Sequence, residues 1–197
     1  SNELMPKLLV ESPRIWADDI SFLIDELENI NQDNSIFAGK MNLEQIGVFG
    51  MSMGGIASGQ VCITDKRCMA GINMDGGIYG DFLDTKISQP FMFMSSERYR
   101  GYDNIFSDHV NNSVYTITIH GADHYNFHDL SILDPSFDRL GEIDGYRMLK
   151  IINDYTLIFS KSEKEHSNYE LNATSSTIIT VKPTIAPKVA KSVFLPR

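Results

Sequence analysis

The sequence predicts a layered α/β domain built on a mostly parallel sheet. Four short apolar or β-branched runs, at residues 45–49, 69–74, 90–94 and 114–119, alternate with segments of helical character. Strands that alternate with helices pair in parallel, because each helix carries the chain back across the sheet. The 197 residues are 42% hydrophobic, which suffices for one domain with a sizeable core.

The first elements in the chain are a helix, a strand and a second helix. Residues 14–30 carry apolar side chains at spacings of three and four with carboxylates between them, which predicts an amphipathic helix. Its apolar stripe consists of Trp16, Ile20, Leu23, Leu27 and Ile30. A polar loop follows over residues 31–40. Residues 45–49 predict a short buried strand, and the small, apolar residues 54–62 predict a helix packed tightly on the sheet.

The second half of the chain continues the alternation. We expect helices over residues 102–110 and 145–159, the second of them amphipathic and the last element of the domain. Beyond it the chain becomes polar and then rich in Thr and Pro. The sequence therefore predicts a domain over residues 14–160 and a polar tail over residues 161–197, either irregular or forming an edge strand.

Charge and cysteine content narrow the classes of function. The net charge of −9 and a pI near 4.9 argue against nucleic acid as a partner, since phosphate binding needs clustered Lys and Arg. No apolar run approaches the roughly 18 residues of a membrane span. Localisation stays open between a secreted or periplasmic and a cytoplasmic protein. Cys62 and Cys68 lack metal-binding spacing, so we expect two half-buried thiols, with a disulfide as the alternative.

The segment GMSMGG, at residues 50–55, joins a predicted strand to a predicted helix. Small residues at Gly50 and Gly54 permit a tight turn that exposes the Ser52 hydroxyl at the carboxyl end of the sheet. The backbone amide of Met53 then points to where an oxyanion would form. This context predicts that Ser52 is a nucleophile; the alternative is a serine that only caps the helix.

A nucleophilic serine needs a base that takes its proton and an acid that orients the base. His124 follows the strand at 114–119 by five residues, on a loop at the same end of the sheet, and is the predicted base. His120 is the nearest alternative, but it directly follows that strand and is expected to be structural.

Two carboxylates compete for the role of the acid. Asp75 follows the strand at 69–74 in a glycine-rich turn, whereas Glu97 follows the strand at 90–94. Asp123 is adjacent to His124 and would point away from the imidazole, so it is a weaker candidate. The short, fixed carboxylate favours Asp75, and Glu97 stays open.

These pieces together resemble the α/β-hydrolase superfamily, and within it the platelet-activating-factor acetylhydrolase-like esterases, including bacterial members labelled predicted dienelactone hydrolases. The matching segments lie at residues 19–27, 50–55, 70–76, 90–97, 124–127 and 143–147, within residues 14–160. In that family the acid follows the earlier strand, so the resemblance implies Asp75. Both neighbours of Ser52 are Met, where the family often has His before the nucleophile and Phe or Leu after it.

The resemblance implies a serine hydrolase that cleaves carboxylic esters of short or medium acyl chains, including phospholipid-like esters. It implies an acyl-serine intermediate and neither a metal nor an organic cofactor. Met51, Met53, Met74, Phe127 and Leu130 are expected to form an apolar wall, with Met51 and Phe127 contacting the substrate, although Met74 and Leu130 suit the core equally. The alternatives are a polyester or cutin-like esterase, a lactone hydrolase, or a non-catalytic binding module.

One departure from the resemblance concerns the start of the chain. An α/β-hydrolase carries several strands before the helix that leads to the nucleophile, and residues 1–13 cannot hold them. We therefore expect the C-terminal part of a three-layer α/β-hydrolase sandwich without its N-terminal strands. The second oxyanion donor would lie upstream. The exposed sheet edge would pair with a second copy or with the missing N-terminal segment.

Overall fold

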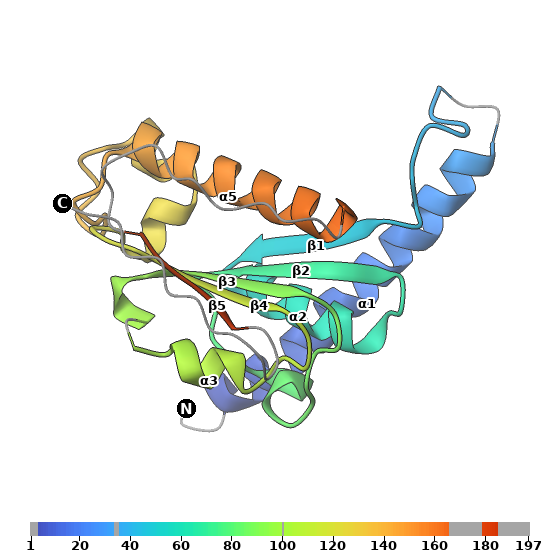
Figure 1. The fold of residues 1–197 in the computed structure, drawn as a ribbon, viewed down its shortest axis with the longest axis horizontal. Helices are drawn as coiled ribbons and strands as arrows, with labels where there is room; N and C mark the ends of the chain where they lie inside the picture. The colour runs from blue at the N-terminus through green and yellow to red at the C-terminus, as the bar shows by residue number, and fades with distance from the viewer. Residues whose placement is uncertain (1–3, 34–35, 100, 166–178, 185–197) are drawn as a thin grey trace.

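The computed structural model describes residues 4–33, 36–99, 101–165 and 179–184. Its sheet runs in the order β1-β2-β3-β4-β5. The strands are β1 (Ile46–Met51), β2 (Cys68–Met74), β3 (Phe91–Ser96), β4 (Val114–Ile119) and β5 (Ile179–Thr184). The first four are parallel, and β5 pairs antiparallel with β4 (Figure 1). The predicted α/β fold with a mostly parallel sheet is confirmed. The rest of the predicted tail beyond residue 165 lies outside the described residues.

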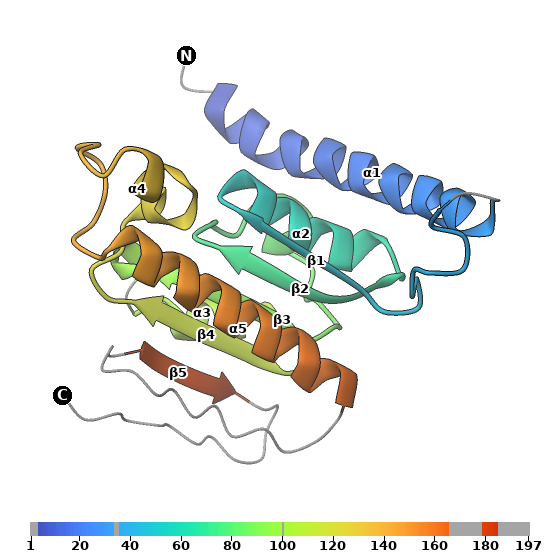
Figure 2. The same cartoon turned by 90° about the horizontal axis from the view of Figure 1, so that it is seen from above.

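Helices cover both faces of the sheet. The α-helices are α1 (Leu4–Gln32), α2 (Met53–Thr64), α3 (Asp103–Ser107), α4 (Leu130–Leu133) and α5 (Gly145–Glu165), with 3-10 turns η1 (Gly80–Leu83), η2 (Glu97–Tyr99) and η3 (His124–Phe127). Helix α5 lies across one face, and α1 and α2 lie on the other (Figure 2). None of the helices in the described part of the chain combines the length and apolarity needed to cross a bilayer.

Each face of the sheet has its own hydrophobic core. Under α5, Met148 and Tyr155 pack on Met74, Met94 and other apolar residues of β2, β3 and β4. On the opposite face, α2 packs over an aromatic cluster whose rings stack or meet edge to face. Its members are Phe82, Phe91, Phe93 and Phe106. Burial on both faces explains why β2 and β3 read as continuous apolar runs.

Helix α1 begins ten residues before its predicted start and buries a different stripe. Ala17 and Ile24 are buried, whereas Trp16 and Leu23 are 45% and 56% exposed. The predicted stripe was therefore only partly correct. The reason is that the close approach of α1 to α2 suits the small side chain of Ala17, and the larger apolar side chains lie to one side of that contact.

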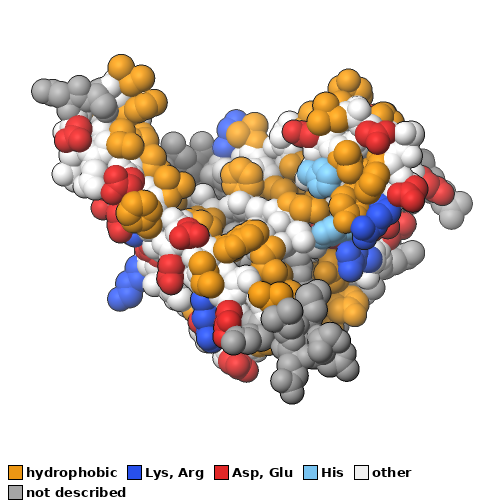
Figure 3. Space-filling view, turned by 180° about the vertical axis from the view of Figure 1, so that it is seen from behind, with side chains coloured by type: hydrophobic (Ala, Val, Ile, Leu, Met, Phe, Trp, Pro, Cys, Tyr) orange, Lys and Arg blue, Asp and Glu red, His pale blue; other side chains and the backbone are white. Residues whose placement is uncertain are grey.

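Strand β1 is half-buried, so the prediction of a buried strand was wrong. Phe49 is 63% exposed, because within the described residues no strand pairs with β1 on the side away from β2. Figure 3 views the face that carries α1, where hydrophobic side chains gather around a central hollow with histidine side chains at one margin.

Two further expectations are corrected. Helix α3 is shorter than predicted, because His109 O and Asn111 N hydrogen-bond to Ile87 and draw the following residues into a β-bridge. Cys62 and Cys68 are buried and joined as a disulfide rather than kept as half-buried thiols. Their positions at the end of α2 and the start of β2 bring them together, with 5.1 Å between their Cα atoms.

Candidate active site

Ser52 lies in the turn between β1 and α2 in a strained backbone conformation. Its φ and ψ are 56° and −119°, and its side chain makes no capping hydrogen bond to α2 although it occupies the N-cap position. Its backbone N–H donates to Met74 O at 2.8 Å, which fixes the turn against the end of β2. Met53 is the first residue of α2, so its N–H has no acceptor within the helix.

Glycines permit this turn, although not all at the predicted positions. A Cβ at Gly50 would lie 2.5 Å from Gly54 C, so the predicted need for glycine at position 50 is confirmed. The Gly54 backbone lies against Gly50, but a Cβ at Gly54 would meet nothing within 4 Å, so the predicted need for a small residue at position 54 was wrong. The tight position is Gly55, where a Cβ would lie 2.9 Å from Gly50 O and overlap the Asn73 side chain.

Asp75 follows β2 directly, one strand away from Ser52. The register pairs Met51 with Met74, so Ser52 and Asp75 occupy equivalent places after neighbouring strands. Asp75 has φ 52°, and in the described part of the chain it shares a positive φ only with Ser52 among residues other than glycine. Such conformations persist where the surrounding structure enforces them and cluster at functional sites.

The Asp75 carboxylate is fully buried and bonded at both oxygens. Its Oδ1 accepts a hydrogen bond from Ser96 N at 2.7 Å, and its Oδ2 lies 2.7 Å from His124 Nδ1. A buried carboxylate needs such partners, because an unpaired charge in the interior is costly. The His124 side chain remains 21% exposed, so the imidazole lies between the buried acid and the surface.

The alternative candidates for acid and base make other contacts: Glu97 and His120 pair with each other, and Asp123 caps η3. Glu97 Oε1 lies 2.8 Å from His120 Nδ1, so the alternative acid and the alternative base form a separate pair. Asp123 caps η3 by accepting from His124 N at 2.6 Å. Of the three carboxylates considered from the sequence, Asp75 is the one beside the His124 imidazole.

Three residues that sequence reasoning missed hold the site in place. Ser96 supplies the backbone donor to Asp75. The Asn73 side chain accepts from Gly76 N at 2.8 Å and thereby shapes the turn that contains Asp75. Asn126 Oδ1 accepts from Asp123 N at 2.8 Å and from Gly141 N at 2.7 Å. The Asp-x-x-Asn spacing at 123–126 is a capping-box signal that would have indicated the last of these.

A cavity of about 250 Å³ opens beside the turn, between β1, η3 and α5. Met51, Met74 and Phe127 line it, whereas Ser52, Asp75 and His124 do not, nor do Met53 and Leu130. Met74 and Phe127 are also members of the core under α5. Within the described residues, no three potential metal-ligating side chains gather in one place.

A mostly parallel sheet with a strained serine at a strand-to-helix turn is typical of the α/β-hydrolase fold. The structure of ferulic acid esterase from Streptomyces cinnamoneus is similar to that of this chain, with a TM-score of 0.70 and 19% sequence identity. The match covers 84% of this chain and 52% of the esterase, and it supports the fold.

The family model for platelet-activating factor acetylhydrolase, isoform II, matches residues 24–179, and the chain belongs to that family. Platelet-activating factor acetylhydrolase from Bos taurus is 27% identical over 152 residues, and the enzyme of the same name from Canis lupus familiaris is 27% identical over 154. Each match covers 72% of this chain. The chain spans 32% of the length of these curated relatives.

Proposed function

We propose that this protein hydrolyses carboxylic esters through an acyl-serine intermediate, with Ser52 as nucleophile, His124 as general base and Asp75 as the orienting acid. The observation that carries the proposal is the 2.7 Å contact between His124 Nδ1 and a fully buried Asp75 carboxylate. Asp75 and the strained Ser52 follow the ends of the neighbouring strands β2 and β1. Membership of an acetylhydrolase family supports the same chemistry.

Each residue has a defined part in the proposed reaction. Ser52 Oγ attacks the ester carbonyl while His124 Nε2 accepts its proton, and the same proton then passes to the leaving alcohol. Asp75 accepts from Nδ1–H, which presents Nε2 to the serine in the basic tautomer and stabilises the imidazolium that forms. Water then attacks the acyl-serine with His124 again as base, which regenerates the free serine.

The Met53 amide is the proposed oxyanion donor, since it begins α2 and points its N–H away from the helix. The positive end of the α2 dipole adds to this stabilisation. The loss of one oxyanion donor typically costs about 10²- to 10³-fold in turnover. We propose a short-chain, phospholipid-like ester as substrate, because the curated relatives are acetylhydrolases of platelet-activating factor.

The test is covalent labelling of the full 197-residue chain with a fluorophosphonate, read by intact mass. We expect a gain of one adduct per chain, and no gain for Ser52→Ala with an unchanged thermal unfolding midpoint. A chain that stays unlabelled contradicts the proposal. Short and long p-nitrophenyl esters then report acyl preference.

The same labelling assay tests whether Asp75 or Glu97 is the orienting acid. Asp75→Asn is expected to slow labelling by orders of magnitude, because it stabilises the wrong tautomer of His124. Glu97→Gln is expected to reduce the labelling rate far less. Asp84→Asn, a change at an exposed aspartate after η1, is expected to leave the labelling rate unchanged. The reverse ranking of Asp75 and Glu97 would transfer the role of the acid to Glu97.

A further inference from the structure

A second histidine–carboxylate pair lies beside the first. Glu97 and His120 directly follow Ser96 and Ile119, which are register partners at the ends of β3 and β4. The His120 Nδ1–H donates to Glu97 Oε1 at 2.8 Å. The pair therefore joins the two segments that leave neighbouring strands at the carboxyl end of the sheet.

Those two segments are the ones that hold Asp75. Ser96, the residue before Glu97, donates its backbone N–H to Asp75 Oδ1 at 2.7 Å. The segment that begins at His120 ends at His124, whose Nδ1 lies 2.7 Å from Asp75 Oδ2. A closed ring of contacts thus runs from Asp75 through Ser96, Glu97, His120 and His124 back to Asp75.

The loop at residues 120–124 is fastened from two sides. On one side, Ile143 N donates to Gly121 O at 2.9 Å and Asn126 Oδ1 accepts from Gly141 N. On the other side, Glu97 provides two links: its backbone N–H donates to Ala122 O at 3.3 Å, and its side chain binds His120. The side-chain contact, at 2.8 Å, is shorter than the backbone contact at 3.3 Å, so we take the side-chain pair as the stronger link between the loop and β3.

The pair lies at the solvent margin, which limits its effect on stability. The side chains of His120 and Glu97 are 29% and 43% exposed, and pairs of this exposure contribute little to folding. A displacement of the loop would instead slow proton transfer through His124, because the rate is sensitive to shifts of about 1 Å in the reacting groups.

We propose that Glu97 and His120 are positioning residues that hold the 120–124 loop against β3 and so keep the His124 imidazole on Asp75. The proposal rests on the function proposed above for Asp75 and His124. Neither Glu97 nor His120 takes part in the proton transfers themselves.

The experiment compares Glu97→Ala, His120→Ala, the double variant and Glu97→Gln in the full chain. The first readout separates the maximal rate of Ser52 phosphonylation from the concentration of fluorophosphonate that gives half that rate. We expect the maximal rate to fall about 5- to 50-fold in both alanine variants, with the half-saturating concentration unchanged, since geometry rather than binding is altered. The double variant should match the single ones, because both remove the same contact.

Glu97→Gln should restore the rate to within a few-fold, because its amide oxygen still accepts from His120 Nδ1–H. The matched control is Asp154→Ala, which removes an exposed ion pair with Lys150 on α5, and it should leave the rate unchanged. Wild-type rates in both alanine variants, additive losses in the double variant, or an equal loss in Glu97→Gln would each overturn the proposal.

A second readout does not depend on Ser52 reactivity. The His124 Nδ1–H proton bound to Asp75 is expected to give a low-field proton NMR signal that disappears in His124→Ala. It should broaden through exchange with water in Glu97→Ala and persist in Glu97→Gln. A wild-type chain without labelling at Ser52 would contradict the proposed function alone, and a signal that is unchanged in Glu97→Ala would contradict the positioning role alone.

Discussion

At the scale of single residues, the site depends on how closely two backbone segments approach each other. The β1–α2 turn leaves space for a Cβ at Gly54 but none at Gly50, although both glycines belong to the same motif. Spacing in the sequence treats them alike, whereas the structure separates their roles.

Alanine substitutions at the two glycines test this difference. Gly50→Ala is expected to lower the free energy of unfolding by about 1–3 kcal/mol, because its Cβ would meet backbone that cannot move aside. Gly54→Ala is expected to be neutral or to stabilise by about 0.4–1 kcal/mol, since alanine restricts the unfolded chain. Urea denaturation measures the free energy of unfolding of both variants. Equal losses would show that the turn relaxes to accept either side chain.

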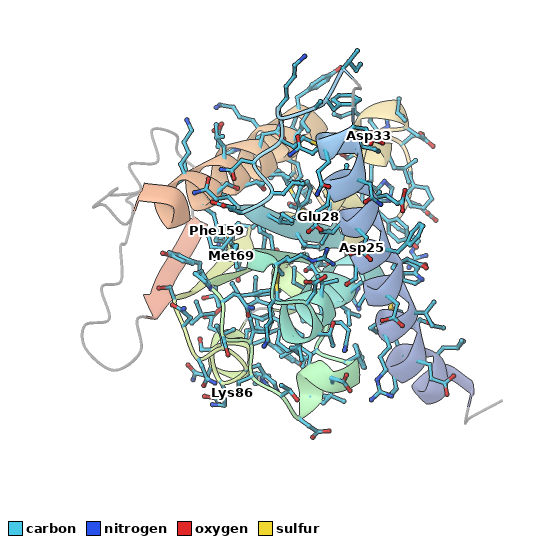
Figure 4. All side chains as sticks on the ribbon, turned by 90° about the vertical axis from the view of Figure 1, so that its right-hand side faces the viewer. Asp25, Glu28, Asp33, Met69, Lys86 and Phe159 are labelled. Carbon is cyan, nitrogen blue, oxygen red and sulfur yellow. A yellow bond between two sulfur atoms is a disulfide. The ribbon has the colours of Figure 1, made fainter. Side chains whose placement is uncertain are left out.

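At the scale of elements, one arginine connects α1 to the turn between α2 and β2. The Arg67 guanidinium lies 2.7 Å from Asp65, 2.6 Å from Asp25 and 3.0 Å from Glu28; the last two are labelled on α1 in Figure 4. The hydrogen bonds from Arg67 lower the pKa of Asp65 to about 2, and the partner carboxylates raise the pKa of Arg67.

This network predicts a pH-dependent contribution to stability. The folded-state pKa of Asp65 lies below the unfolded value of about 3.9, so its contribution is complete above about pH 5 and is lost as the pH falls towards 2. Arg67→Ala is expected to lower the free energy of unfolding by about 1–2 kcal/mol at pH 7. The difference in the free energy of unfolding between Arg67→Ala and wild type should be smaller at pH 3 than at pH 7.

Urea denaturation at pH 7, 5 and 3 measures that difference. Lys150→Ala provides the control, because its pair with Asp154 is exposed and lies within α5. It is expected to cost only about 0.3–0.5 kcal/mol. A wild-type advantage over Arg67→Ala that is as large at pH 3 as at pH 7 would contradict the account.

At the scale of the whole molecule, large apolar side chains on β1 and α1 are exposed. Phe49 on β1 and Phe22 and Leu23 on α1 are each more than half exposed. Unpaired backbone at a sheet edge, together with apolar surface, favours association with another chain. We propose that the protein self-associates through the β1 edge as its concentration rises.

Lysine at this edge is expected to reduce self-association. In sedimentation velocity, Phe49→Lys should shift the onset of the larger species to higher concentration, because a charge on an edge strand opposes pairing. Leu133→Lys introduces the same change at an 80% exposed position on α4 and should behave like wild type. A wild-type protein that is monomeric throughout, or equal effects of both variants, would contradict the proposed interface.

The sequence predicted the strands well because apolar runs that end in glycine-rich turns are a local signal. It located β4 at its observed bounds, and it placed Ser52 and Asp75 just after two strands that prove to be neighbours and His124 on the loop after β4. It did not predict the Glu97–His120 pair, because register between strands depends on tertiary packing. Nor did it distinguish Phe49 from a core residue, since periodicity does not reveal which strand stands at an edge.

The order of the strands has a consequence for how the protein assembles during synthesis. Each of β2, β3 and β4 pairs with the strand that precedes it in the chain, so the sheet grows by one neighbour at a time. Synthesis therefore supplies the Ser52 turn before Asp75, and Asp75 before the loop that carries His124. A nascent chain that ends before residue 124 lacks the proposed imidazole partner of Ser52, so reactivity at Ser52 is expected only in chains that extend beyond β4.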